Sequence, residues 1–149
     1  MFRAFGAADA EAQAQRLKAI ARSRGLKLLV GADAELAARI GADGLHLPER
    51  LAHQAPRLRR AGWIVTCAAH SLMAARRAKA AGADAAVVSA VFPSASPSAG
   101  APIGPVRLAM LTRRAGLPVY ALGGLTSKTA RRLMDAVLVG LAAVDGLRT

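Results

Sequence analysis

The sequence has a single cysteine, few aromatic residues and no long hydrophobic run. One cysteine, Cys67, excludes an internal disulfide and is typical of a protein kept in a reducing cytoplasm. Asp, Arg or Gly interrupts every apolar stretch before it reaches the length of a membrane span. The opening residues 1–6 lead into Ala, Glu and Gln, so they contain no apolar signal core. We therefore expect a cytoplasmic protein that does not cross a membrane.

Acidic residues are also scarce: 9 Asp and Glu face 21 Lys and Arg, giving a formal net charge of +12. Such an excess is compatible with nucleic-acid binding, but the sequence lacks zinc-finger spacing, an aromatic platform and a basic-region heptad. Many arginines instead occur as pairs within or near the ends of predicted helices, namely 59–60, 76–77, 113–114 and 131–132. We interpret them as solvated helix faces, predict no nucleic-acid partner, and note that the charge suits phosphorylated small molecules.

What the sequence does have is a regular alternation of short apolar runs with Ala- and Arg-rich amphipathic segments. This alternation predicts consecutive βαβ units and a parallel sheet in one domain, residues 1–149. The predicted strands are 2–5, 26–30, 45–47, 63–68, 85–92, 119–122 and 140–144, and the predicted helices are 8–22, 34–40, 51–60, 72–80, 105–114 and 127–134. A closed barrel needs about 200 residues or more. We therefore predict an incomplete TIM (β/α)8-type barrel that lacks the first β/α unit and part of the second strand.

Two copies of Gly-Ala-Asp stand between the end of a predicted helix and the start of the next strand. They are Gly41-Ala42-Asp43 and Gly82-Ala83-Asp84. The glycine ends the helix, and the aspartate can accept hydrogen bonds from backbone N–H groups in the turn. Because these turns lead into the N-terminal ends of strands, we expect Asp43 and Asp84 to act in stability.

Catalytic groups of parallel barrels lie in the loops that follow the strands. Gly123-Gly124 follows strand 119–122, where glycine N–H groups and the next helix can approach an anion, and Asp145 follows the last strand. His70 follows strand 63–68 and is either an acid/base or a hydrogen-bonded loop histidine. His46 alternates with apolar neighbours, which favours a satisfied barrel histidine. Cys67 lies in mid-strand and is expected to be a buried, inert thiol.

The order of four motifs resembles the thiamine phosphate synthase family, which includes the TenI-type thiazole tautomerases. The motifs are Gly41-Ala42-Asp43-Gly44-Leu45-His46-Leu47, Ala69-His70-Ser71, Val91-Phe92-Pro93-Ser94-Ala95-Ser96 and Pro118-Val119-Tyr120-Ala121-Leu122-Gly123-Gly124-Leu125. The resemblance implies a transferase that joins hydroxymethylpyrimidine diphosphate to thiazole phosphate, releasing pyrophosphate with the help of magnesium. It further implies that Arg3 faces the diphosphate, that Ser94 and Ser96 belong to a phosphate loop, and that Gly123 and Gly124 bind the thiazole phosphate.

The sequence also departs from that family pattern. Gly31-Ala32 replaces an Asn-Asp pair, which leaves Asp33 one place late, and Pro48-Glu49-Arg50-Leu51 replaces Gly-Gln followed by acids. Asp33 and Glu49 are the remaining candidates for holding magnesium. Phe5 and Pro97 replace lysines, and Asp145 stands where a serine would hold phosphate.

Three functional hypotheses remain open. The first is the transferase in a divergent form. The second is a TenI-like tautomerase that uses His70 as acid/base and needs no magnesium. The third is a non-catalytic paralogue that binds a phosphate ligand. In each case the partners are phosphorylated thiazole or pyrimidine small molecules, and the open edges of an incomplete barrel predict pairing into a homo-oligomer.

Overall fold

Six parallel strands form one curved sheet in the computed structural model, which describes residues 1–3, 6–94 and 100–144. The strands pair in chain order from β1 to β6, each parallel to the next. They are β1 Leu29–Gly31, β2 Gly44–Leu47, β3 Ile64–Ala69, β4 Ala85–Val88, β5 Val119–Leu122 and β6 Gly140–Ala142. Phe2 adds a parallel bridge to Val30 beyond β1, at the position of the strand predicted for residues 2–5.

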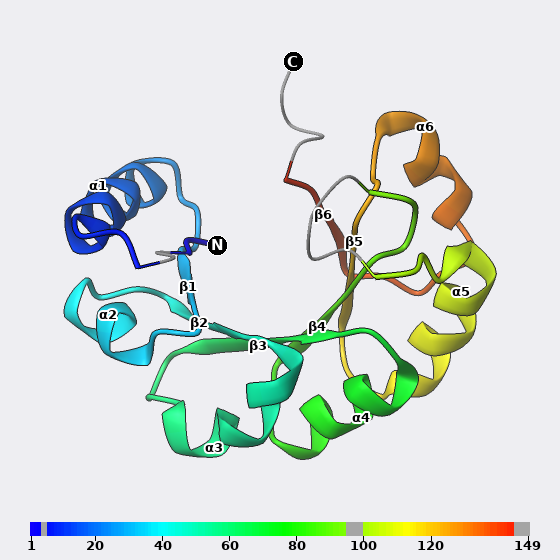
Figure 1. Ribbon diagram of the computed structural model, residues 1–149, viewed down its shortest axis with the longest axis horizontal. Helices are drawn as coiled ribbons and strands as arrows, with labels where there is room; N and C mark the ends of the chain where they lie inside the picture. Colours follow the sequence, from blue (N-terminus) through cyan, green and yellow to red (C-terminus); the bar gives the residue numbers. More distant parts are fainter. Residues whose placement is uncertain (4–5, 95–99, 145–149) are drawn as a thin grey trace.

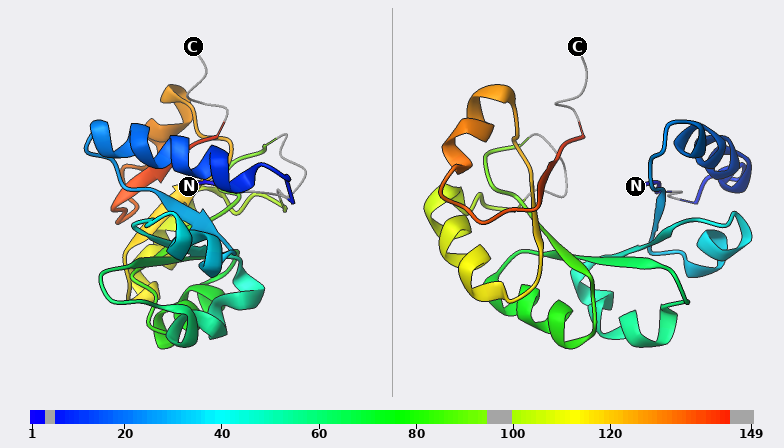
Figure 2. Two further views of the ribbon diagram at one scale, coloured as in Figure 1. Left: turned by 90° about the vertical axis from the view of Figure 1, so that its left-hand side faces the viewer. Right: turned by 180° about the vertical axis from the view of Figure 1, so that it is seen from behind.

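The helices lie on the convex side of this sheet (Figure 1), and the view from behind shows the same arrangement (Figure 2). They are α1 Ala10–Ser23, α2 Ala34–Arg39, α3 Ala55–Leu58, α4 Leu72–Ala80, α5 Gly104–Ala115 and α6 Ser127–Ala130, with 3₁₀ turns η1 Glu49–Gln54 and η2 Arg131–Leu133. Within the described ranges β1 and β6 do not pair, so the sheet curls without closing. The predicted fold class, an incomplete (β/α) barrel, is confirmed.

One face of strand β3 is apolar and packs against the helices. Its residues Val65, Cys67 and Ala69 are fully buried on the helix side, whereas Ile64 at its start is exposed. Small alanines on the facing helices, such as Ala74 and Ala78 of α4, let the helix backbone approach the sheet closely. Burial of these apolar side chains is the main stabilising term of the fold.

The two Gly-Ala-Asp repeats form the same hydrogen-bonded unit at the N-terminal end of the sheet. The N–H of Asp43 donates to the Leu28 carbonyl (2.9 Å) and Asp43 Oδ2 accepts from the Leu28 N–H (2.8 Å). Asp84 repeats this unit with Val65, at 2.8 Å and 2.7 Å. The structural role predicted for both aspartates is confirmed.

Of the two aspartates, Asp43 has the less exposed side chain and forms salt bridges with two lysines. Its side chain is 17% exposed and contacts Lys18 Nζ at 2.6 Å and Lys27 Nζ at 3.3 Å. Burial by itself raises the pKa of Asp43, but hydrogen bonds from Lys18, the Leu28 N–H and Lys27 outweigh it and lower the pKa to about 2.

Four predicted elements are wrong in their extent by more than two residues. The strand predicted for 26–30 begins only at Leu29. The strand predicted for residues 85–92 ends at Val88, because residues 89–92 turn toward β5 and donate Val91 N–H to the Leu122 carbonyl. The helix predicted for 51–60 divides into η1 and α3, where Pro56 cannot donate the backbone hydrogen bond of a continuous helix. The helix predicted for 127–134 divides into α6 and η2.

No helix in the described part of the chain has the length and apolar character that a bilayer crossing requires.

Candidate functional site

The loops that follow the strands meet at one end of the sheet, because all six strands are parallel. His70 follows β3, Ser94 lies in the segment after β4, and Gly123 follows β5. These three residues therefore share the C-terminal rim, which is the arrangement that the sequence predicted. Ser96 and Asp145, together with Phe5 and Pro97, lie outside the described residues.

The Gly123-Gly124 turn is shaped by its contact with the segment after β4. Both residues have positive φ, +97° and +63°. A Cβ on Gly123 would lie 2.9 Å from Cα of Ala90. A Cβ on Gly124 would lie 2.7 Å from Cβ of Phe92 and closer still to the Pro93 carbonyl oxygen. Only glycine fits here, and the contact holds Ser94, the residue after Pro93, beside the glycine turn.

The helix after this turn is shorter than the sequence predicted. α6 has four residues, and Thr126 and Thr129 form a capping box at its start. The Thr126 hydroxyl accepts from the Thr129 N–H at 3.2 Å, and the Thr129 hydroxyl accepts from the Thr126 N–H at 2.8 Å. A helix of one turn has a small dipole, so an anion at this turn would have to be held by individual N–H groups and hydroxyls.

His70 and Glu49 join the loops after β3 and β2. Glu49 Oε2 accepts from the His70 backbone N–H at 3.0 Å and lies 2.9 Å from His70 Nδ1. The other carboxylate oxygen, Oε1, accepts from Arg77 Nη2 at 3.0 Å. An ionised carboxylate only accepts, so the proton of this contact is on His70 Nδ1.

The ionisation of Glu49 follows from the same contacts. Burial raises the pKa of Glu49, but the hydrogen bonds from His70 and the charges of His70 and Arg77 outweigh it, so the pKa lies below its ordinary value. Glu49 is therefore an ionised partner that orients the His70 ring.

A cavity of about 430 Å³ opens on the same rim beside β1 and β2. The residues lining it include Arg3, Gly31, Asp33, His46, Pro48 and Arg50. Gly31 leaves room for the Arg3 side chain, because a Cβ on Gly31 would lie 3.0 Å from Arg3 Cγ. The sequence predicted Arg3 at this site but did not identify Arg50.

His46 is the buried polar group of this cavity. Its side chain is 5% exposed, and Nδ1 lies 2.8 Å from Thr66 Oγ1. Burial, then the positive charges of Arg3 and the chain's amino group, lower the pKa of His46 to about 4, so the ring is neutral near pH 7. The predicted satisfied barrel histidine is confirmed. Its place in the cavity was missed, although the register pairs it with another polar residue, Thr66.

The two candidate magnesium ligands lie in separate environments. Asp33 caps α2, where its Oδ1 accepts from the Leu36 N–H at 2.8 Å, and both oxygens of Glu49 are occupied by His70 and Arg77. Among residues 1–3, 6–94 and 100–144 no group of three or more His, Cys, Asp and Glu side chains could hold a metal ion. The donor set therefore does not fit a magnesium site, and we derive no step through one.

Cys67 is fully buried, and burial raises the pKa of its thiol to about 11. The predicted burial of the thiol is confirmed, and its lack of reactivity stays a prediction.

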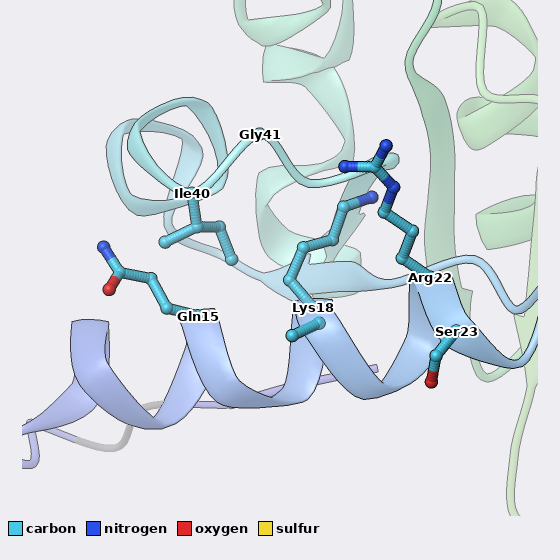
Figure 3. A pocket seen from close by; sticks show the side chains of 7 residues that line it. Gln15, Lys18, Arg22, Ser23, Ile40 and Gly41 are labelled. Carbon is cyan, nitrogen blue, oxygen red and sulfur yellow. The ribbon is translucent and has the colours of Figure 1, made fainter.

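A second hollow, of about 770 Å³, lies between α1 and the turn after α2. Figure 3 shows Lys18 and Arg22 of α1 directed toward the turn at Ile40 and Gly41. This turn leads into the N-terminal end of β2, so the hollow lies at the end of the sheet opposite the rim. Lys18 forms a salt bridge with Asp43, the aspartate of the first Gly-Ala-Asp repeat.

Comparison with known proteins agrees with this geometry. The family model described as thiamine monophosphate synthase matches residues 2–147. A thiamine-phosphate synthase of Thiobacillus denitrificans is 36% identical over 143 residues, which is 94% of this chain and 68% of that protein. A thiamine-phosphate synthase of Chromobacterium violaceum is 36% identical over 139 residues, 91% of this chain and 66% of that protein.

Among solved structures, a thiamine phosphate pyrophosphorylase from Pyrococcus furiosus superimposes with a TM-score of 0.73 at 25% identity. The match covers 90% of this chain and 64% of that one, so the chain spans about two thirds of the length of these relatives. The order of strands, the rim of loops and the match over residues 2–147 lead to one conclusion: the chain belongs to the thiamine monophosphate synthase family.

Proposed function

We propose that the chain acts in thiamine biosynthesis as a thiamine-phosphate synthase, forming thiamine phosphate and pyrophosphate from hydroxymethylpyrimidine diphosphate and thiazole phosphate. The observation that supports the proposal is that one rim holds two features suited to an anion. The glycine turn beside Ser94 is one, and the cavity containing Arg3 is the other. The names of the relatives, thiamine-phosphate synthase, support the same reaction.

Each region has a distinct task in this reaction. The N–H groups of Gly123 and Gly124 and the Ser94 hydroxyl hold the thiazole phosphate, since glycine lets the backbone come close to an anion. A new bond between the two heterocycles forms as the bond from the pyrimidine to the diphosphate breaks. Negative charge then grows on the leaving diphosphate, and the Arg3 guanidinium stabilises it.

The proposal is tested by incubating the purified chain with both substrates and measuring thiamine phosphate and pyrophosphate. We expect equal amounts of the two products. Arg3→Ala should reduce turnover by about 100-fold, the effect typical of losing one donor to a developing anion. Arg57→Ala, which removes an exposed arginine of α3, is the matched control. A wild-type chain that forms neither product under these conditions contradicts the proposal.

The His70–Glu49 pair favours a second candidate function, a TenI-like tautomerisation of the thiazole phosphate. A histidine that is oriented through Nδ1 can use Nε2 to move a proton between two positions of a bound ring without a metal. This candidate predicts thiazole isomerisation that persists in EDTA and disappears in His70→Ala. In Glu49→Gln, ¹⁵N spectra should show His70 moving from the Nδ1–H tautomer toward the Nε2–H tautomer.

Binding of thiazole phosphate without either reaction would identify the third hypothesis, a non-catalytic paralogue. The magnesium dependence that the resemblance implies stays a prediction, and comparing the synthase assay in MgCl₂ and in EDTA checks it. Association into a homo-oligomer also stays a prediction, which light scattering of the purified chain would test.

A further inference from the structure

The charged side chains around the 430 Å³ cavity leave it with an excess of positive charge. Arg3 and Arg50 both line the cavity, and Asp33 is the acid among its lining residues. The Asp33 carboxylate accepts the Leu36 N–H as the cap of α2, so one of its oxygens already has a donor. His46, the buried polar side chain of the cavity, is neutral near pH 7.

Arg50 and the preceding Glu49, at the start of η1, contact different parts of the molecule. Glu49 extends toward the loop after β3, where its two oxygens accept from His70 and Arg77. Arg50 lines the cavity instead, and within the described ranges its guanidinium forms no ion pair or hydrogen bond. Arg50 is an exposed residue of the cavity lining, and a planar guanidinium can donate two hydrogen bonds to one phosphate group.

We propose that Arg50 is an anion-binding residue, and that with Arg3 it holds the diphosphate of the substrate by direct guanidinium–phosphate contacts. The inference rests on the proposed function only for its choice of diphosphate as the anion. A metal-bridged diphosphate would need carboxylates directed at the ligand, whereas Glu49 is bound to His70 and Arg77 and Asp33 caps a helix. The two arginines of the cavity lining would supply the positive charge instead.

The test is calorimetric titration of the full chain with inorganic pyrophosphate, in buffer that contains EDTA and in buffer that contains MgCl₂. We expect saturable binding in EDTA. Arg50→Ala should weaken it at least tenfold, equivalent to about 1.4 kcal/mol. Arg50→Lys should retain part of the affinity, because lysine keeps the positive charge but cannot donate two parallel hydrogen bonds to a phosphate. Arg57→Ala, a nearby exposed arginine on α3, should bind as the wild-type chain does.

Three outcomes would overturn the inference. In the first, pyrophosphate does not bind in EDTA and binds only when MgCl₂ is present. In the second, Arg50→Ala binds pyrophosphate with wild-type affinity. In the third, Arg57→Ala loses as much affinity as Arg50→Ala. Circular dichroism of each variant separates a loss of binding from a loss of folding. Failure of the proposed function is distinguishable, because metal-free pyrophosphate binding without thiamine phosphate formation contradicts the synthase assignment and leaves the role of Arg50 standing.

Discussion

Replacing Gly124 with alanine tests how the glycine turn of the site is built. Gly124 has φ +63°, and Gly41 has nearly the same value, +62°. The surroundings of the two residues differ. A Cβ on Gly124 would collide with the Pro93 carbonyl oxygen and lie 2.7 Å from Phe92 Cβ, whereas a Cβ on Gly41 would meet nothing within 4 Å. Gly41→Ala is therefore a matched control for the backbone conformation alone.

The expected magnitudes follow from these two contributions. Alanine in the left-handed region costs about 1–2 kcal/mol, which both variants lose. Overpacking a fitted contact costs about 1–3 kcal/mol more, and only Gly124→Ala has this term. We expect urea denaturation to give a loss of roughly 1–2 kcal/mol for Gly41→Ala and roughly 2–5 kcal/mol for Gly124→Ala.

Ligand affinity should also fall more in Gly124→Ala than in Gly41→Ala. Gly124→Ala displaces the segment that holds Ser94, so affinity for thiazole phosphate should fall at least about tenfold, while Gly41→Ala at the opposite end should retain it. Equal losses of stability in the two variants, with thiazole phosphate affinity unchanged in both, would refute the close contact between the glycine turn and residues 90–93.

Two further predictions concern the framework of the barrel. Asp43→Asn should lower the free energy of unfolding by about 2 kcal/mol at pH 7, because the pKa of Asp43 is lowered from 3.8 to about 2 in the folded chain. A lowered pKa stabilises the folded chain above about pH 4, and this stabilisation is lost as the pH falls toward 2. The difference in free energy of unfolding between wild type and Asp43→Asn should therefore shrink over that range. A difference that does not change with pH would contradict this prediction. The Cys67 thiol, fully buried with a pKa of about 11, should resist a thiol reagent at pH 8 in the native chain and react once urea unfolds it, whereas fast native labelling would show that β3 is exposed.

Much of the fold follows from local patterns in the sequence. The predicted helix over 72–80 and the predicted strand over 119–122 match α4 and β5, since each has a clear period and a glycine or proline near its boundary. Asp43 and Asp84 were assigned correctly because the repeat fixes their place in successive β/α units.

The site was harder to predict, because its partners come from different loops. Nothing in the sequence around Glu49 shows that His70, 21 positions later, occupies its carboxylate. The early end of β4 could not be predicted for the same reason. Residues 89–92 contact the Gly123-Gly124 turn, and these contacts form only in the folded chain. The place of Arg50 in the cavity lining was not predicted, because a basic residue at a helix start usually indicates a solvated face.

The proposed function requires the loops at the C-terminal ends of the strands to bind a phosphorylated heterocycle. The most direct test is an NMR titration of the ¹⁵N-labelled chain with thiazole phosphate, following backbone amide signals. The structure predicts the largest shifts at Ser94, Gly123 and Gly124, with Gly41 and Gly82 at the opposite end unchanged. Shifts concentrated at Gly41 and Gly82, with the rim amides unmoved, would contradict the account.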